Sequence, residues 1–211
     1  MARSAPASTD TSAPVVSHAE RRRRQEEAIL TAALERLRGA GPDTITVRRL
    51  ADDTGYSTWV VYKLYGSKDG LFEAIVAHGY DLLDGRCADV LDRHPEPFDR
   101  LTHLGLEFHR FARDEPALFR AMFLGSLQWE ATDGARRRHE QSFALVCDTV
   151  AAVIAAGVLQ GEPDDVGLML WAGVMGVATQ ELGGHIDADR SDLLVQQVTV
   201  SLVAANLGPN G

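Results

Sequence analysis

The stretch that decides the fold of this 211-residue chain is TITVRRLADDTGYSTWVVYKLYGSKDGLF, residues 44–72. Apolar residues recur at helical spacing on both sides of Gly55, which predicts two short helices over about 46–53 and 57–64. A turn between two such helices often needs a positive φ, and glycine adopts it without steric cost. The expected inner faces carry Val47, Leu50, Ala51 and either Val60 or Val61. The segment therefore predicts a helix-turn-helix.

Serine caps indicate where the neighbouring helices begin. Ser17-His-Ala-Glu20 matches a capping box, so the first helix is expected to start at Ser17. Ser57 is expected to cap the helix over 57–64, and Ser67 a fourth helix that runs towards residue 92. The first helix carries an apolar stripe at i, i+4 and i+8, formed by Ile29, Ala33 and Leu37.

The second helix of such a pair fits the major groove of DNA, with its N-terminal residues aimed at base edges. Thr46 stands at a helix start, where free backbone N–H groups favour anions. Lys68 opposes the dipole of its own helix, an objection that a nearby phosphate would remove. We expect DNA contacts from Arg23, Thr46, Arg48, Ser57, Thr58, Trp59, Tyr62, Lys63 and Lys68.

Two of these expectations have plain alternatives. Arginines 21–24 can grip phosphates or simply form a solvated helix start, although four arginines in a first turn are poorly placed for the helix dipole. Trp59 can contact DNA or pack against its own domain, and the apolar contact that a buried tryptophan makes favours packing.

Helical spacing continues beyond residue 80, and prolines and glycines separate the segments. Further helices are expected over about 98–113, 116–126, 134–159, 164–182 and 190–206. With about nine helices and no alternating stretch, the fold class is all-α. The expected divisions are a disordered arm over 1–17, a three-helix helix-turn-helix domain over 18–78 and a larger helical domain over 79–208.

The charge of −9 is distributed unevenly along the chain. Residues 1–80 hold 11 basic and 10 acidic residues, whereas residues 81–211 hold 10 basic and 20 acidic ones. The overall acidity therefore says little about whether the N-terminal part meets DNA. Cys87 and Cys147 have no CxxC partner, which favours a reducing cytoplasm, and no run approaches the ~18 apolar residues of a membrane span.

The 44–72 segment resembles the tetracycline-repressor-like (TetR) family of bacterial regulators, and the similarity covers about residues 22–76. The matching residues are Thr46, Leu50-Ala51, Gly55, Ser57, Val61-Tyr62, Tyr65, Gly66-Ser67-Lys68-Asp69 and Leu71-Phe72. The family usually has a small residue at the position of Trp59 and an aliphatic one at Tyr56, so its base contacts do not carry over directly. The resemblance implies a nucleoid-associated repressor that binds a palindromic double-stranded DNA operator as a homodimer, and that a small, mostly apolar effector releases.

The stretch from Leu170 to Gly183 resembles the Trp-containing penultimate helix of one subgroup of that family. This implies that the last two helices form a four-helix dimer bundle. Each glycine inside a helix costs about 1 kcal/mol, so glycines 167, 173 and 176 indicate close packing rather than local looseness. The expected dimer residues are Gly173, Gly176, Leu194, Val198 and Leu202.

Aromatic and polar residues of the larger domain are the candidates for an effector pocket. They are His103, His109, Phe119, Phe123, Gln128, Trp129 and Trp171. Filling the core is the alternative role for each aromatic residue. Neither a metal nor a cofactor is expected, because the chain has no HExxH motif.

Two other functions are weighed beside the regulator. A dimeric DNA-binding regulator without a ligand shares every N-terminal feature. A helical enzyme is disfavoured because the chain lacks a Glu-x-x-His pair, a glycine-rich phosphate loop and a Gly-x-Ser-x-Gly motif.

Overall fold

The computed structural model describes residues 17–207, so the arm expected over 1–17 lies almost wholly outside the described residues. The described part contains nine α-helices, a short 3-10 turn (Pro42–Thr44) and no strand, which confirms the all-α prediction. One isolated bridge joins Leu159 to Leu207. The helices are α1 (His18–Ala40), α2 (Val47–Thr54), α3 (Thr58–Tyr65), α4 (Lys68–Arg93), α5 (Pro97–Asp114), α6 (Pro116–Phe123), α7 (Asp133–Ala155), α8 (Pro163–Leu182) and α9 (Ala188–Ala205). None of these helices is long and apolar enough to cross a membrane.

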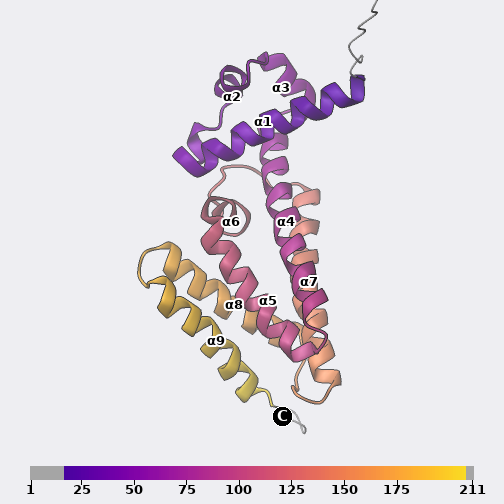
Figure 1. Ribbon diagram of the computed structural model, residues 1–211, viewed down its shortest axis with the longest axis vertical. Helices are drawn as coiled ribbons and strands as arrows, with labels where there is room; N and C mark the ends of the chain where they lie inside the picture. The colour runs from indigo at the N-terminus through magenta and orange to yellow at the C-terminus, as the bar shows by residue number, and fades with distance from the viewer. Residues whose placement is uncertain (1–16, 208–211) are drawn as a thin grey trace, which may run out of the picture.

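Helices α1 to α3 gather at one end of the molecule, where the start of α4 packs against them (Figure 1). The apolar stripe of α1 faces inward as predicted, since Ile29 and Ala33 are fully buried. Leu50 and Val61 bring the inner faces of α2 and α3 to the same core. Gly55 ends α2 with φ 71°, the left-handed conformation that the turn was expected to need.

Two of the three expected serine caps are present, and Thr46 provides a cap that was not predicted. The hydroxyls of Ser17, Thr46 and Ser67 accept hydrogen bonds from the backbone N–H groups of the first turns of α1, α2 and α4. The prediction that Ser57 caps α3 is wrong, because its side chain accepts no cap hydrogen bond. Its hydroxyl is instead exposed beside the first turn of α3.

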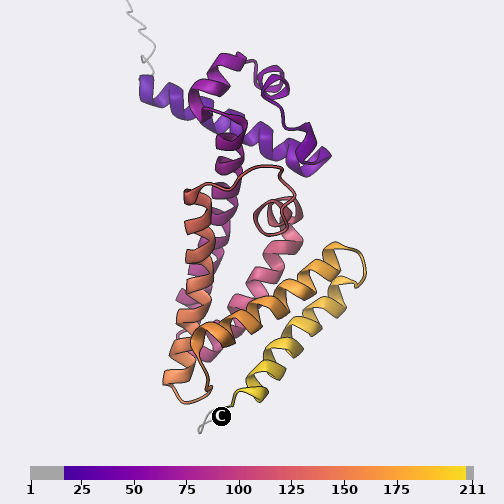
Figure 2. The ribbon, with the colours of Figure 1, turned by 180° about the vertical axis from the view of Figure 1, so that it is seen from behind.

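The remaining helices build an elongated bundle below this end (Figures 1 and 2). Helix α4 runs from the N-terminal unit into the bundle, and α8 and α9 pair along its outer edge. Two helices end earlier than predicted, α6 at Phe123 rather than near 126 and α7 at Ala155 rather than near 159. Gly125 and Gly157 explain this, because each adopts a positive φ that an α-helix does not continue through.

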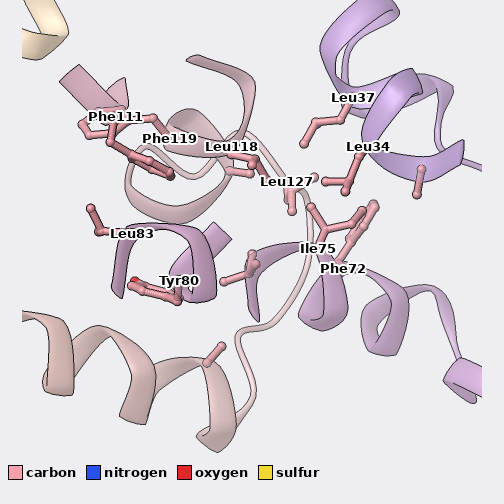
Figure 3. Close-up of a cluster of buried hydrophobic side chains, with 14 of the residues drawn as sticks. Leu34, Leu37, Phe72, Ile75, Tyr80, Leu83, Phe111, Leu118, Phe119 and Leu127 are labelled. Carbon is pink, nitrogen blue, oxygen red and sulfur yellow. The ribbon is translucent and has the colours of Figure 1, made fainter. Parts of the chain in front are cut away.

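One hydrophobic core extends from the N-terminal helices into the bundle, and a second, smaller cluster around Leu101, Val150 and Leu170 is separate from it. Figure 3 shows Leu34 and Leu37 of α1 facing Phe72 and Ile75 of α4, with Leu127 from the loop after α6 between them. The boundary expected near residue 79 therefore falls inside α4 and inside a shared core. The first three helices are therefore joined to the larger domain by packed side chains as well as by α4.

Candidate DNA-binding surface and effector cavities

Helix α3 presents an aromatic and basic outer face. Trp59 is 65% exposed and Tyr62 is 53% exposed, whereas Val61 between them is buried. The interpretation that Trp59 packs against its own domain is therefore wrong. Its ring is instead covered by Lys63, whose Nζ lies 4.8 Å from the ring centroid. This cation–π contact holds a positive charge beside a large flat surface, both pointing away from the core.

A groove separates this face of α3 from the start of α1, with a volume of about 420 Å³. Its walls are His18, Arg21, Arg22 and Gln25 from α1 and Trp59, Val60, Lys63 and Leu64 from α3. The groove contains Arg21 and Arg22 but not Arg23, whose guanidinium lies 3.7 Å from Glu20 on the same helix. Arg21, Arg22 and Gln25 follow His18 at i+3, i+4 and i+7, so all four share one face of α1. This spacing is the signal in the sequence that could have selected Arg21 and Arg22 as groove residues.

The angle between α3 and α1 is fixed by specific polar contacts. The Tyr65 hydroxyl donates a 2.9 Å hydrogen bond to the backbone carbonyl of Glu26, and burial raises the pKa of Tyr65 to about 12. The phenol is therefore a neutral donor across the physiological range. Arg36 of α1 donates from Nε and Nη2 to the two carboxylate oxygens of Asp53 in α2, and these hydrogen bonds lower the pKa of that carboxyl group. Such contacts preorganise the reading surface.

The other predicted DNA contacts lie on the surface. All nine are exposed, and those not yet placed are Arg48, Thr58 and Lys68. Lys68 extends over the ring of Phe72, with Nζ 4.8 Å from the centroid. The Thr46 hydroxyl accepts a hydrogen bond from Arg49 N, which leaves its O–H able to donate to a phosphate.

Two cavities occupy the larger domain. The inner cavity lies between α4, α5, α7, α8 and α9, holds about 50 Å³ and is lined almost wholly by apolar residues. The outer cavity is larger, about 500 Å³, and opens between α4, α6, the 124–131 loop and α7. The lining of the outer cavity mixes aromatic rings with Arg136, His139 and Glu140.

Only some of the predicted effector residues reach these cavities. Trp171 lines the inner cavity, and Phe123 and Trp129 line the outer one. Phe119 is fully buried, with its ring centroid 5.4 Å from that of Phe108.

The three polar candidates lie elsewhere. Gln128 is exposed outside both cavities, and His103 stacks on His94 with centroids 3.6 Å apart. His109 is buried away from both cavities, so an orienting role for these side chains is not supported by their positions. Sequence reasoning missed Tyr80 and His139, whose hydroxyl oxygen and Nδ1 lie 3.2 Å apart at the outer cavity. Their separation by 59 residues leaves no local pattern to find.

His109 belongs to a charged cluster that joins α5 to α8 and α9. Arg113 binds Glu181 and Asp192 at 2.7 and 2.6 Å, and Ser191 donates to Glu181. The ring of His109 lies 2.8 Å from the Glu181 carboxylate but is not aligned to donate a hydrogen bond to it. Burial lowers the pKa of His109 and favours its neutral form.

The carboxylates in this cluster keep their charge. Hydrogen bonds from Arg113 lower the pKa of Asp192. Burial raises the pKa of Glu181, but hydrogen bonds from Arg113 and Ser191 outweigh it and leave that pKa below its usual value. At neutral pH the cluster therefore joins α5 to α8 and α9 through ion pairs. Among the described residues, no group of three His, Cys, Asp or Glu side chains is arranged to hold a metal ion.

The predicted dimer residues divide between an inner and an outer face of the α8–α9 pair. A Cβ added at Gly173 would lie 2.4 Å from Cγ1 of Val198, so this glycine admits α9 of its own chain, and Leu202 flanks the same contact. Gly176 has nothing within 4 Å of such a Cβ. The exposed surface between α8 and α9 is mostly apolar and is lined by Met169, Gly173, Leu194, Val198 and Leu202, and Leu168, Leu193 and Val200 are further exposed apolar residues of the same two helices.

Comparison with known proteins matches both parts of the chain. The family described as "Bacterial regulatory proteins, tetR family" matches residues 29–75, and "Tetracyclin repressor-like, C-terminal domain" matches residues 101–201. Among curated relatives, the nucleoid occlusion factor SlmA of Pectobacterium carotovorum is 31% identical over 126 residues, 59% of this chain and 63% of the relative. The SlmA protein of Yersinia pestis matches to the same extent. This chain therefore spans less than two thirds of the length of those relatives.

Solved structures share the fold over most of the chain. A Rhodococcus protein of unknown function superposes with a TM-score of 0.79 at 21% identity, covering 87% of this chain and 95% of the other. A TetR transcription regulator from Haloarcula marismortui gives 0.71 at 23% identity, covering 88% and 99%. With a helix-turn-helix unit and a larger helical domain that each match a tetR family description, and with this shared architecture, the chain belongs to the tetR family of bacterial regulatory proteins, which are transcriptional regulators and not enzymes.

Proposed function

We propose that the protein is a transcriptional repressor that binds a palindromic DNA operator as a homodimer and is released by a small, mostly apolar effector. The observation that carries this proposal is the outer face of α3, where Trp59, Tyr62 and Lys63 project beside Arg21 and Arg22 of α1. A helix with such a face can enter the major groove while its basic neighbours meet phosphates.

Charge supports the same assignment of roles. The arginines and lysines of the groove lie in the part of the chain that is near neutral overall, whereas the acidic excess lies beyond residue 80. An acidic larger domain is repelled by DNA, so the molecule is expected to approach with its α1–α3 end forward. This orientation leaves the two cavities accessible to an effector.

DNA binding is tested by selecting an operator from random duplex DNA and measuring affinity as a function of salt. Replacing Lys63 with Ala should weaken binding and reduce the slope of log K against log salt by about one unit, because one phosphate contact is lost. The matched control is Arg93→Ala, which removes an exposed positive charge at the far end of α4. If both variants behave like the unmodified protein at every salt concentration, α3 is not the DNA-contacting helix.

The dimer is proposed to form through the exposed apolar face of α8 and α9. Val200 is 63% exposed on α9, whereas Val198 packs on Gly173 within its own chain. Val200→Arg should therefore yield a folded monomer by light scattering, since it places charge in the seam without disturbing the intrachain contact. A variant that stays dimeric would move the seam to another surface.

Effector release is favoured over the ligand-free alternative by the outer cavity, whose volume of about 500 Å³ lies in the range of small-molecule sites. The proposal requires reciprocity, so saturating operator must weaken effector binding by the factor by which effector weakens operator binding. A ligand whose affinity ignores the operator is not the effector. A regulator whose operator affinity no bound ligand changes would support the ligand-free reading.

A further inference from the structure

The inner and outer cavities lie end to end along the same two helices. On α4 the lining passes from Val76 at the outer cavity to Cys87 at the inner one, and on α7 it passes from Ala135 to Val146. Each interval is eleven residues, which at 1.5 Å per residue corresponds to about 16 Å. The two hollows together therefore have the dimensions of a long, narrow site.

Aromatic rings that contact one another lie between the two cavities. Trp171 lines the inner cavity and Phe123 the outer one, and their ring centroids lie 5.7 Å apart. Phe108 on the inner side is 5.3 Å from Phe123, also centroid to centroid. At such distances the rings touch, so Phe108 and Trp171 on the inner side meet Phe123 on the outer side.

Phe123 is the ring between the cavities that lies at the end of a helix. Phe123 is the last residue of α6 and is partly exposed, and the chain turns at Gly125 with φ 62° just beyond it. Rotation of this side chain towards the outer cavity needs no rearrangement of a helix interior. The inner cavity, at about 50 Å³, holds only a few water molecules as it stands, so a ligand tail enters by displacing this ring.

The two ends differ in chemistry. The inner end has two hydroxyl groups, those of Ser142 and Thr199, and Thr199 already donates to the backbone carbonyl of Val195. The outer end offers Tyr80 and His139, with Arg136 and Glu140 at its mouth. These two charges are of opposite sign, which favours a head that forms hydrogen bonds but carries no net charge.

We propose that both cavities form one site for a single-chain amphiphile, with an unbranched apolar tail in the inner cavity and an uncharged, hydrogen-bonding head in the outer one. This inference names the chemical class of the proposed effector and in that sense rests on the proposed function. Binding itself can be measured without DNA. Failure of the site and failure of DNA binding are therefore separate results.

The test uses the straight-chain alcohols 1-hexanol, 1-decanol and 1-tetradecanol with the full-length protein. Tryptophan fluorescence in a Trp59→Phe background reports binding, because Trp129 and Trp171 line the two cavities. Affinity should rise by about fourfold for each methylene group buried and then level off once the tail exceeds the site. Equal affinity for 1-hexanol and 1-tetradecanol would overturn the shared site.

Variants locate the tail. Ser142→Leu fills the inner cavity and should reduce 1-tetradecanol binding to the level of 1-hexanol while leaving 1-hexanol unchanged. Gly105→Ala is the second, milder variant, because its added Cβ lies 3.6 Å from Val174, an ordinary contact that the fold accepts. Its matched control is Gly85→Ala on α4, where nothing lies within 4 Å. If neither variant changes the chain-length series, the tail does not occupy the inner cavity.

Charged probes test the head. Sodium decanoate and decyltrimethylammonium have the tail length of 1-decanol with a negative or a positive head. Both should bind more weakly than the alcohol, since a charged head loses its hydration on binding while the opposite charges of Arg136 and Glu140 offset one another. Tighter binding of either ion would overturn the assignment of an uncharged head.

Discussion

Two glycines on α8 provide a matched pair that tests how closely α8 approaches α9. Gly173 and Gly176 both lie in the interior of the same helix, so replacing either with alanine removes the same conformational cost, about 1 kcal/mol. Their surroundings differ sharply. An added Cβ meets Val198 at 2.4 Å in the first case and nothing within 4 Å in the second.

The expected free energies of unfolding follow from these two terms. Gly176→Ala should gain about 1 kcal/mol, the propensity term alone. At Gly173 the same gain is opposed by overpacking, which costs about 1–3 kcal/mol in a well-packed interior. Val198 cannot relieve the clash cheaply, because a β-branched side chain in a helix has one strongly preferred rotamer. Gly173→Ala should therefore be less stable than Gly176→Ala by about 1–3 kcal/mol.

The assay is urea unfolding followed by circular dichroism at two protein concentrations tenfold apart. If Gly176 lies in the dimer seam, its alanine variant gains stability at the lower concentration and loses part of that gain at the higher one, because association then contributes less. The refuting result is a Gly173→Ala protein as stable as Gly176→Ala at both concentrations. That outcome would mean that α8 and α9 are not held in contact at Gly173.

Three further predictions concern the surface, the ionic cluster and the connection between the domains. Trp59→Ala should relax sequence preference at the contacted base pairs by about 1–3 kcal/mol in a binding-site selection, whereas Trp129→Ala should leave it unchanged without ligand. Arg113→Ala should lower stability by about 2 kcal/mol at neutral pH, because it leaves partly buried carboxylates unpaired. That stability difference should shrink as pH falls through the lowered pKa values of Glu181 and Asp192, because a carboxylate with a depressed folded-state pKa loses its stabilising effect when it is protonated. A stability difference that does not change with pH would contradict this prediction. Glu115→Gln, which breaks the 2.9 Å pair with Arg38, should cost less than 1 kcal/mol of stability but reduce the effect of 1-tetradecanol on operator affinity, measured by fluorescence anisotropy with and without the alcohol.

Local sequence signals predicted most of the helices because their causes are local. Capping at Ser17 and Ser67 depends on residues within one turn, and the structure confirms both predictions. Ser57 has the same residue type in the right place, yet its side chain accepts no cap hydrogen bond. The helix ends beyond Phe123 and Ala155 were missed because the prediction followed apolar spacing past glycines whose positive φ ends the helix.

The candidate sites were harder to predict because they depend on contacts between distant segments. Helical periodicity of α1 contained the information that Arg21 and Arg22 share the face of His18, but which face meets α3 is a tertiary property. His109 has the residue type expected of a pocket, but it is buried against Glu181 of α8, 72 residues away in the sequence. Residue type predicted that these side chains have a role, whereas the packing of distant segments determines which role each one has.

We expect two helices, α4 and α6, to couple effector binding to DNA binding. Helix α6 also packs on α1, where Glu115 at its start pairs with Arg38. The other end of this eight-residue helix is Phe123, the ring that divides the two cavities. A tail that displaces Phe123 acts on the C-terminal end of α6, and the N-terminal end of α6 contacts α1. Only a ligand that binds better to the displaced arrangement can shift the equilibrium, however tightly it binds otherwise. The inner cavity opens to the outer one only when Phe123 has moved. Ligands with longer tails should therefore weaken operator binding more strongly.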